Sequence, residues 1–249
     1  MNRIHLRTAG IAMATAAACS ALTLAVTVRQ QEKNAQDKWA SHYYSRVDQF
    51  KRENAATRNI VMVGSSHIER FDAAKYLPGR RVVNRGIAAD RIGIGERGVL
   101  RRLDCSVFNC NPGFIILENG ANDLGELWRH GTPSIDEVEQ CYRAVVRQIS
   151  TRLPDVPLVV VGVFPTRGRF AELKPFIVEF NKRLERIAAD FGCPFMEVYK
   201  PFADDTGLLR EELTGDGLHL NDAGYRIWTE LIEKILPPRD TRRGEAATE

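Results

Sequence analysis

Five short apolar runs, separated by stretches with helical spacing, constrain the fold more than any other feature of this chain. The runs cover residues 59–64, 81–84, 114–118, 157–163 and 194–198. The first and fourth contain four or more consecutive apolar residues and do not alternate with polar ones. Continuous apolar runs of this length are typical of strands that are covered on both faces, as parallel strands are.

Helical patterns follow these runs at residues 89–103, 134–152, 175–191 and 221–236. Strands that alternate with helices predict a parallel sheet with helices on each side, joined by right-handed crossovers. We therefore expect an α/β fold with a five-stranded parallel sheet. In such a sheet, functional residues lie beyond the carboxyl ends of the strands.

Composition is that of an ordinary globular protein, with 44% hydrophobic and 27% charged residues. The net charge is +3 and the positive side chains are scattered, so nucleic-acid binding has no compositional support.

We expect four segments: a signal or membrane anchor over residues 1–29, an amphipathic helical lead-in over 30–57, a globular domain over 58–236 and a disordered tail over 237–249.

The N-terminus combines a basic start with a long apolar stretch. Arg3 and Arg7 precede an uncharged run over residues 8–28, about as long as a membrane-spanning helix needs. We expect an uncleaved anchor that holds the protein in the cell envelope, on the extracytoplasmic or periplasmic side. A cleaved signal is the main alternative, and lipoprotein processing at Cys19 and a buried soluble helix are the others.

In an exported protein, Cys105 and Cys110 are either a disulfide pair or separate buried thiols.

A serine follows the first strand in the segment Gly64-Ser65-Ser66-His67. On a tight turn into a helix the Ser66 hydroxyl is exposed, and the helix N-terminus stabilises nearby negative charge, as a nucleophile requires. The alternative is that Ser66 only caps the helix. His67, Glu69 and Arg70 come next, and we expect them at the surface, with a role in lining the pocket as the alternative.

Two candidate oxyanion donors follow the second and third strands. The backbone N–H of Gly86 is accessible because no side chain blocks it. The side-chain amide of Asn122 is a suitable second donor. The alternative for both is ordinary turn chemistry, which Gly and Asn favour.

Asp216 and His219 lie three residues apart, just before the last helical pattern. At this separation the carboxylate reaches the Nδ1–H of His219, which leaves Nε2 free to take a proton from Ser66. A solvated loop that caps the helix is the alternative. No cluster of metal-ligand spacing is evident.

Taken together, these segments resemble the SGNH (GDSL-type) hydrolase superfamily over residues 58–236. The resemblance implies a three-layer α/β/α flavodoxin-like sandwich and ester hydrolysis without a metal or organic cofactor. It implies Ser66, Asp216 and His219 as catalytic residues. It also implies that the oxyanion hole is formed by Ser66, Gly86 and Asn122.

The chain departs from the family pattern at three places. Ser65 replaces the Asp of Gly-Asp-Ser, which makes two adjacent serines candidates for the nucleophile, and position favours Ser66. His67 stands where the family has Leu or Ile. Ala88 and Ala89 stand where a glycine often occurs in the second block.

The leading hypothesis is a serine esterase that acts on an acyl ester, such as an O-acetyl or other O-acyl group on an envelope glycan. A small-molecule ester is also a possible substrate. The same machinery fits a lipid-directed esterase or thioesterase. A non-catalytic flavodoxin-like binding module and a degenerate hydrolase kept for partner binding are the competing classes.

Overall fold

The computed structural model describes residues 27, 30–31, 33–34, 37–53 and 59–238. By its internal contacts the chain divides into two units, residues 1–44 and residues 45–249. Nearly all of the expected anchor, residues 32, 35–36 and 54–57 of the lead-in and most of the expected tail lie outside the described residues.

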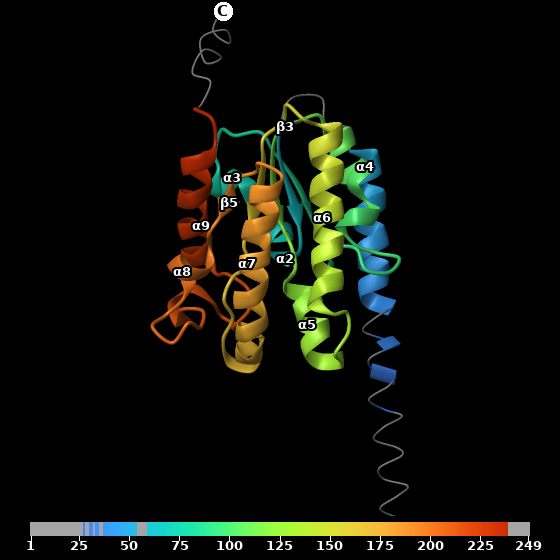
Figure 1. The fold of residues 1–249 in the computed structure, drawn as a ribbon. Helices are drawn as coiled ribbons and strands as arrows, with labels where there is room; N and C mark the ends of the chain where they lie inside the picture. The colour runs from blue at the N-terminus through green and yellow to red at the C-terminus, as the bar shows by residue number, and fades with distance from the viewer. Residues whose placement is uncertain (1–26, 28–29, 32, 35–36, 54–58, 239–249) are drawn as a thin grey trace, which may run out of the picture. The chain divides into compact units, whose positions relative to one another are not determined.

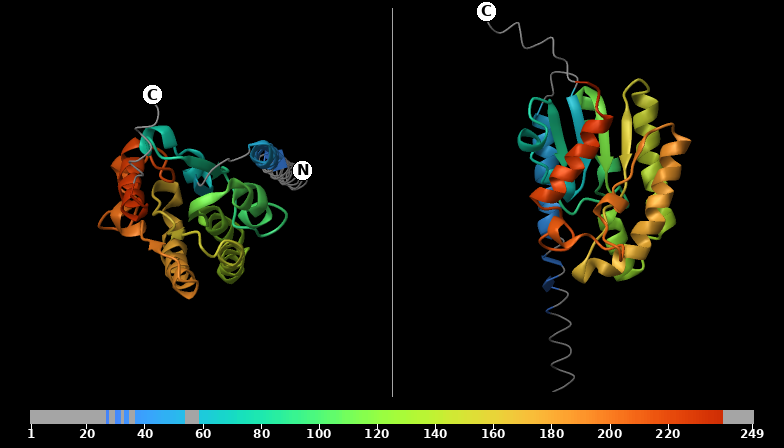
Figure 2. Two further views of the ribbon diagram at one scale, coloured as in Figure 1. Left: turned by 90° about the horizontal axis from the view of Figure 1, so that it is seen from above. Right: turned by 90° about the vertical axis from the view of Figure 1, so that its left-hand side faces the viewer.

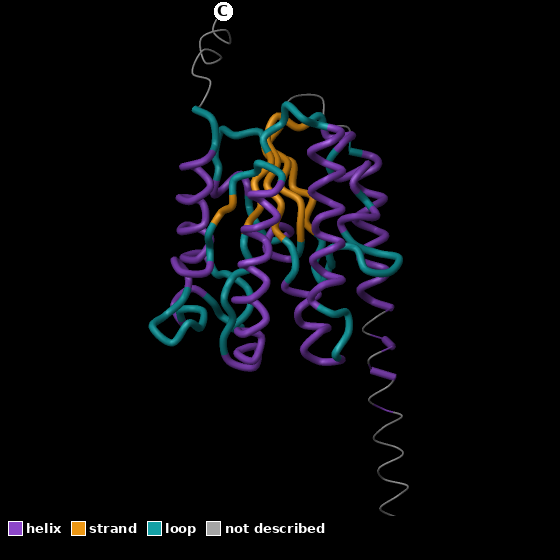
Figure 3. The backbone as a smooth tube through the Cα atoms, viewed as in Figure 1, coloured by secondary structure: helices purple, strands orange, loops and turns teal. Residues whose placement is uncertain are grey.

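A five-stranded parallel sheet forms the centre of the second unit. Its strands are β1 (Asn59–Gly64), β2 (Val82–Gly86), β3 (Pro112–Glu118), β4 (Leu158–Val161) and β5 (Phe195–Met196). The spatial order is β2-β1-β3-β4-β5 and every pairing is parallel. This is the flavodoxin-like order, so the predicted fold class and sheet are confirmed. Figure 3 shows the strands gathered between the helices.

From β1 onward, helices lie between the strands and after β5, of which α5, α6, α7 and α9 are long and the others are short. Their bounds are α2 (Ser66–Glu69), α3 (Ala73–Tyr76), α4 (Leu103–Ser106), α5 (Ala121–His130), α6 (Ile135–Arg152), α7 (Lys174–Asp190), α8 (Tyr199–Phe202) and α9 (Asp222–Ile235). Short 3-10 turns lie at Val99–Arg101, Phe108–Cys110, Gly168–Leu173 and Glu211–Leu213.

Two separate apolar cores, one on each face of the sheet, hold the helices against the sheet. On one face Val63, Ile115 and Val160 pack with side chains of α6 and α7. On the other face Met62 and Ile116 pack with side chains of α2, α8 and α9. The arrangement can be followed in Figures 1 and 2, in which α6 and α7 lie side by side. The alternate apolar residues of each strand thus serve opposite cores, which explains the continuous apolar runs.

The helix predicted at residues 89–103 is wrong. This segment is a loop followed by a single 3-10 turn, and α4 is only four residues long. Gly93, Gly95 and Gly98 adopt φ angles of 145°, 87° and 125°, which an α-helix cannot contain. The other three predicted helices correspond to α6, α7 and α9, and the Asn221 side chain caps α9 by accepting from the Gly224 N–H at 3.1 Å.

A helix over residues 37–52 occupies most of the predicted lead-in. Tyr43, Val47 and Phe50 are buried, whereas Trp39 and Tyr44 are exposed, so the helix is amphipathic. Within the described ranges no helix combines the length and apolar character that a membrane span needs.

The four cysteines of the described region are free thiols. The Cys110 Sγ donates a hydrogen bond to the Cys105 carbonyl oxygen at 3.6 Å instead of bonding to the neighbouring sulfur. Burial raises the pKa of the Cys110 thiol. The structure therefore has the pair as separate buried thiols.

Candidate active site

Ser66 lies at the first position of α2, directly beyond the carboxyl end of β1. Its Oγ is 3.0 Å from Nε2 of His219, which comes from the loop before α9. The contact joins residues that are 153 positions apart in sequence. A serine held against an imidazole nitrogen is the arrangement of an activated nucleophile, because the imidazole can take the hydroxyl proton.

The adjacent Ser65 points elsewhere. Its Oγ donates to the carboxylate of Glu118 at 3.0 Å, and Glu118 is fully buried at the end of β3. Ser65 occupies the cap position of α2 without a side-chain capping bond. Geometry therefore separates the two serines, since Ser66 faces the imidazole and Ser65 faces a buried carboxylate.

Asp216 and His219 lie in one turn of the chain before α9. The Asp216 Oδ2 is 2.6 Å from Nδ1 of His219, and its Oδ1 accepts the N–H groups of Leu218 and His219 at 2.9 and 2.8 Å. Burial opposes ionisation of Asp216, but the hydrogen bonds from His219 and the two N–H groups outweigh it, so the pKa of Asp216 lies well below its usual range. An ionised Asp216 places the Nδ1 proton of His219 toward itself and leaves Nε2 to accept from Ser66.

The electrostatic setting keeps His219 available as a base. Burial lowers the pKa of His219 below the ordinary histidine value, the hydrogen bond to Asp216 opposes this, and the neighbouring His67 and Arg70 add to the lowering. A neutral imidazole is therefore the dominant form at neutral pH, as proton abstraction requires.

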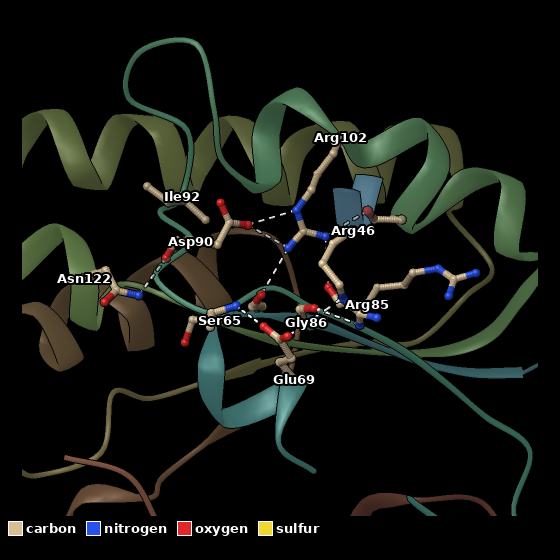
Figure 4. Close-up of polar contacts among 12 residues, drawn as sticks. Arg46, Ser65, Glu69, Arg85, Gly86, Asp90, Ile92, Arg102 and Asn122 are labelled. Carbon is tan, nitrogen blue, oxygen red and sulfur yellow. Dashed lines mark hydrogen bonds and ion pairs between the residues drawn. The ribbon is translucent and has the colours of Figure 1, made fainter. Parts of the chain in front are cut away.

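Asn122 lies in the first turn of α5, just beyond β3. Its amide Nδ2 donates to the backbone carbonyl of Asp90 at 2.8 Å (Figure 4). An amide nitrogen carries two hydrogens, so one N–H of Asn122 remains for another acceptor. The bond to Asp90 holds the amide plane in place, which is what an oxyanion donor needs.

The expected role of Gly86 needs correction, because its N–H is already used. That N–H donates to Oδ1 of Asn84 at 3.0 Å, at the end of β2. A Cβ at residue 86 would collide with the backbone of Glu69 in α2. The glycine thus permits the close approach of α2 to β2 and does not present a free donor.

Ala89, in the loop after β2, carries an unused backbone N–H that the sequence did not single out. It has a φ of 59°, the left-handed region that only glycine enters freely. Its N–H has no acceptor within the described part of the chain, and the next residue, Asp90, is the one that Asn122 holds. The alanine at a position where the family often has glycine was the available signal, since glycine marks a need for positive φ.

A buried guanidinium connects the segments that carry these groups (Figure 4). Arg102 forms an ion pair with Asp90 at 2.8 Å, and the two side chains are 0% and 1% exposed. The same guanidinium donates to the carbonyl oxygens of Gly64 at 3.1 Å and Arg85 at 2.9 Å. Arg102 therefore ties together the end of β1 before Ser66, the end of β2 and the loop that positions Asn122.

Among the residues after the nucleophile, His67 differs from the surface position expected for it. It is 2% exposed, and its Nε2 lies 3.1 Å from the Leu218 carbonyl oxygen. Arg70 is exposed, and Glu69 is half-buried and accepts the Ala88 N–H. No three His, Cys, Asp or Glu side chains of the described residues cluster closely enough to hold a metal ion.

Comparison with known proteins identifies a sequence family, a curated relative and solved structures with the same fold. The sequence profile of the GDSL-like lipase/acylhydrolase family matches residues 65–227. An N-acylneuraminate cytidylyltransferase from Escherichia coli is 23% identical over 215 residues, which cover 86% of this chain and 48% of that protein. The chain thus spans about half the length of this curated relative.

Solved structures share the fold at low sequence identity. A protein described as a platelet activating factor from Streptococcus pneumonia has a TM-score of 0.72 at 20% identity, covering 81% of this chain and 96% of its own. A GDSL-like lipase from Bacteroides thetaiotaomicron has a TM-score of 0.67 at 20% identity, covering 77% and 95%. A catalytic mutant of an acetylxylan esterase from Geobacillus stearothermophilus has a TM-score of 0.58 at 16% identity, covering 71% and 93%.

The family match covers more than half of the chain and includes Ser66, Asn122, Asp216 and His219. The chain therefore belongs to the GDSL-like lipase/acylhydrolase family.

Proposed function

We propose that the protein is a serine esterase that uses Ser66, His219 and Asp216 as its catalytic triad. The observation that carries this proposal is the unbroken hydrogen-bonded path from Ser66 Oγ to His219 at 3.0 Å and from His219 to Asp216 at 2.6 Å. Both contacts lie within the distances that proton transfer and orientation of the imidazole require.

In the proposed reaction, His219 Nε2 takes the proton of Ser66 as Oγ bonds to the ester carbonyl carbon. Negative charge develops on the carbonyl oxygen, and the N–H groups of Ser66, Ala89 and Asn122 stabilise it. The N–H of Ser66 is free because the first N–H groups of a helix have no intrahelical acceptor. Collapse of this intermediate breaks the ester C–O bond, and His219 returns the proton to the departing alcohol. Water then attacks the acyl-enzyme by the same proton path.

For the substrate we propose an O-acyl group, such as O-acetyl, on an envelope glycan. Two observations support it: the apolar stretch over residues 8–28, and the similarity of the fold to an acetylxylan esterase. The same stretch leads us to propose that the chain is anchored to a membrane and that its hydrolase domain lies on the extracytoplasmic side. Cytidylyl transfer, the activity in the name of the curated relative, needs a nucleotide chemistry that a Ser-His-Asp path does not supply.

Steady-state hydrolysis of p-nitrophenyl esters tests the triad. We expect Ser66→Ala to abolish turnover and Ser65→Ala to retain most of it, which makes Ser65 the matched control. Fluorophosphonate labelling followed by peptide mapping should place the label on Ser66. Equal turnover by Ser66→Ala and the wild type would refute the mechanism.

Acyl chain length tests the substrate class. We expect acetyl esters and acetylated glycans to be hydrolysed faster than long-chain esters. A preference for long chains would instead favour a lipid-directed esterase or thioesterase. Fractionation of cells that express the full chain tests the anchor, since an anchored protein stays with the membranes after a high-salt wash.

A further inference from the structure

A second histidine lies buried beside the proposed triad and takes no part in its proton path. His67 follows Ser66 directly in α2, is 2% exposed, and packs 5.8 Å from His219 between ring centroids. Its ring also packs against the ring of Phe164. Its backbone carbonyl accepts a hydrogen bond from the Tyr225 hydroxyl at 2.9 Å. A buried imidazole costs free energy unless both of its nitrogens are satisfied, so its contacts need an explanation.

The Nε2 side of this imidazole holds the loop that carries the base. Nε2 is 3.1 Å from the carbonyl oxygen of Leu218. A carbonyl oxygen only accepts, so Nε2 must carry the proton. The peptide that joins Leu218 to His219 is then held at both ends, because its N–H donates to Asp216 at 2.8 Å. The position of the His219 backbone is therefore set by Asp216 on one side and His67 on the other.

The Nδ1 side faces a buried carboxylate. Nδ1 lies 3.6 Å from Oε1 of Glu118, a residue with 0% exposure at the end of β3. Neither atom has a hydrogen-bond partner in the described region. The separation is within the range of an ion pair but longer than a hydrogen bond, so the carboxylate faces this edge of the ring without a hydrogen bond to it. The second oxygen of Glu118 accepts the Ser65 hydroxyl at 3.0 Å, so one carboxylate contacts both sequence neighbours of Ser66.

We propose that His67 is a positioning residue for the hydrolase reaction. Glu118 orients its imidazole, and this imidazole fixes the loop that carries His219 against the helix that carries Ser66. The proposal rests on the triad proposed above. It explains why a histidine stands where the family has Leu or Ile: an aliphatic side chain packs equally well but cannot hold the Leu218 carbonyl. The chain then contains two carboxylate–imidazole pairs. Asp216 and His219 transfer the proton, whereas Glu118 and His67 set the distance over which the proton moves.

The test compares His67→Leu and His67→Gln, with Ser66→Ala and Tyr225→Phe alongside. We expect His67→Leu to lower kcat on p-nitrophenyl acetate by about 10- to 100-fold with little change in KM, because small displacements of a catalytic group cost rate and not ground-state binding. His67→Gln keeps an N–H donor on a side chain of similar reach, and we expect it to recover most of this loss. The rate of fluorophosphonate labelling should follow kcat.

Tyr225→Phe is the matched control, since it removes a buried hydrogen bond to the same residue without touching the Leu218 contact. We expect it to lower the unfolding midpoint in urea about as much as His67→Leu does while it leaves kcat close to that of the wild type. Equal losses of kcat in the two variants would reduce His67 to a structural role and overturn the proposal.

The outcomes separate this inference from the triad on which it rests. Wild-type kcat in His67→Leu together with an inactive Ser66→Ala overturns the inference alone. An active Ser66→Ala overturns the proposed triad. Should His67→Leu fail to fold, Glu118→Gln replaces it: we expect several-fold lower kcat at unchanged KM, and an unchanged kcat in that variant contradicts the proposal.

Discussion

The buried pair of Arg102 and Asp90 offers the sharpest test of how this site is held together. Both side chains are almost completely shielded from water, and the guanidinium makes further bonds to the carbonyls of Gly64 and Arg85. Removal of one member of a buried pair costs about 3–5 kcal/mol, because the other charge is left uncompensated. We therefore expect Arg102→Met to lower the free energy of unfolding by about 3–5 kcal/mol.

A second substitution separates the charge from the lost backbone contacts. Burial raises the pKa of Asp90, and Arg102 opposes that effect, so loss of Arg102 makes the ionised Asp90 still more costly. Asp90→Asn removes this charge and keeps the size. We expect the double variant Arg102→Met/Asp90→Asn to be more stable than Arg102→Met by about 1–3 kcal/mol, the penalty for leaving a buried polar group without its partner. The bonds to the two carbonyls are missing in both variants and cancel in this comparison.

Urea unfolding followed by circular dichroism measures these differences. The exposed pair of Lys51 and Asp48, at 3.3 Å and with side chains 62% and 60% exposed, provides the control. We expect Lys51→Met to change stability by less than about 1 kcal/mol. The reasoning is refuted if the double variant is less stable than Arg102→Met, or if Arg102→Met behaves like Lys51→Met.

Three further predictions concern single groups. Asn122→Ala should lower kcat by about 100- to 1000-fold with KM nearly unchanged in ester hydrolysis, because an oxyanion donor acts mainly in the transition state; a loss confined to KM would contradict this role. Asp216→Asn should lower kcat by about 10⁴-fold. In the pH profile of its residual kcat/KM, the acid limb should move to lower pH, because Asp216 raises the pKa of His219 against burial, His67 and Arg70; a shift to higher pH would be inconsistent with the assigned contacts. Burial raises the pKa of Asp123 to about 7. A group with a raised folded-state pKa binds its proton more tightly when folded, so its contribution to stability falls as pH rises from about 4 to about 7. Asp123→Asn, which keeps an acceptor for the Ile92 N–H, should flatten this fall in urea unfolding at pH 5 and pH 8, and parallel profiles would count against it.

Much of this protein follows from its sequence. The apolar runs at residues 59–64 and 157–163 predict buried parallel strands, and parallel strands bring their carboxyl ends to one edge of the sheet. Ser66 and Asn122 follow different strands, so the sequence predicts that they lie at one site. Asp216 and His219 follow from spacing alone, because a separation of three residues is a local geometry.

Only the tertiary structure decided which polar groups are already engaged. The N–H of Gly86 is used by Asn84, the helix expected at residues 89–103 is a loop, and His67 is buried against the loop of His219. Each of these outcomes depends on atoms brought together by packing, some from segments more than a hundred residues apart. Periodicity and local spacing determine which elements form and where they end, whereas a hydrogen bond depends on a few tenths of an ångström between elements, and that distance is set only when the two cores close on either side of the sheet.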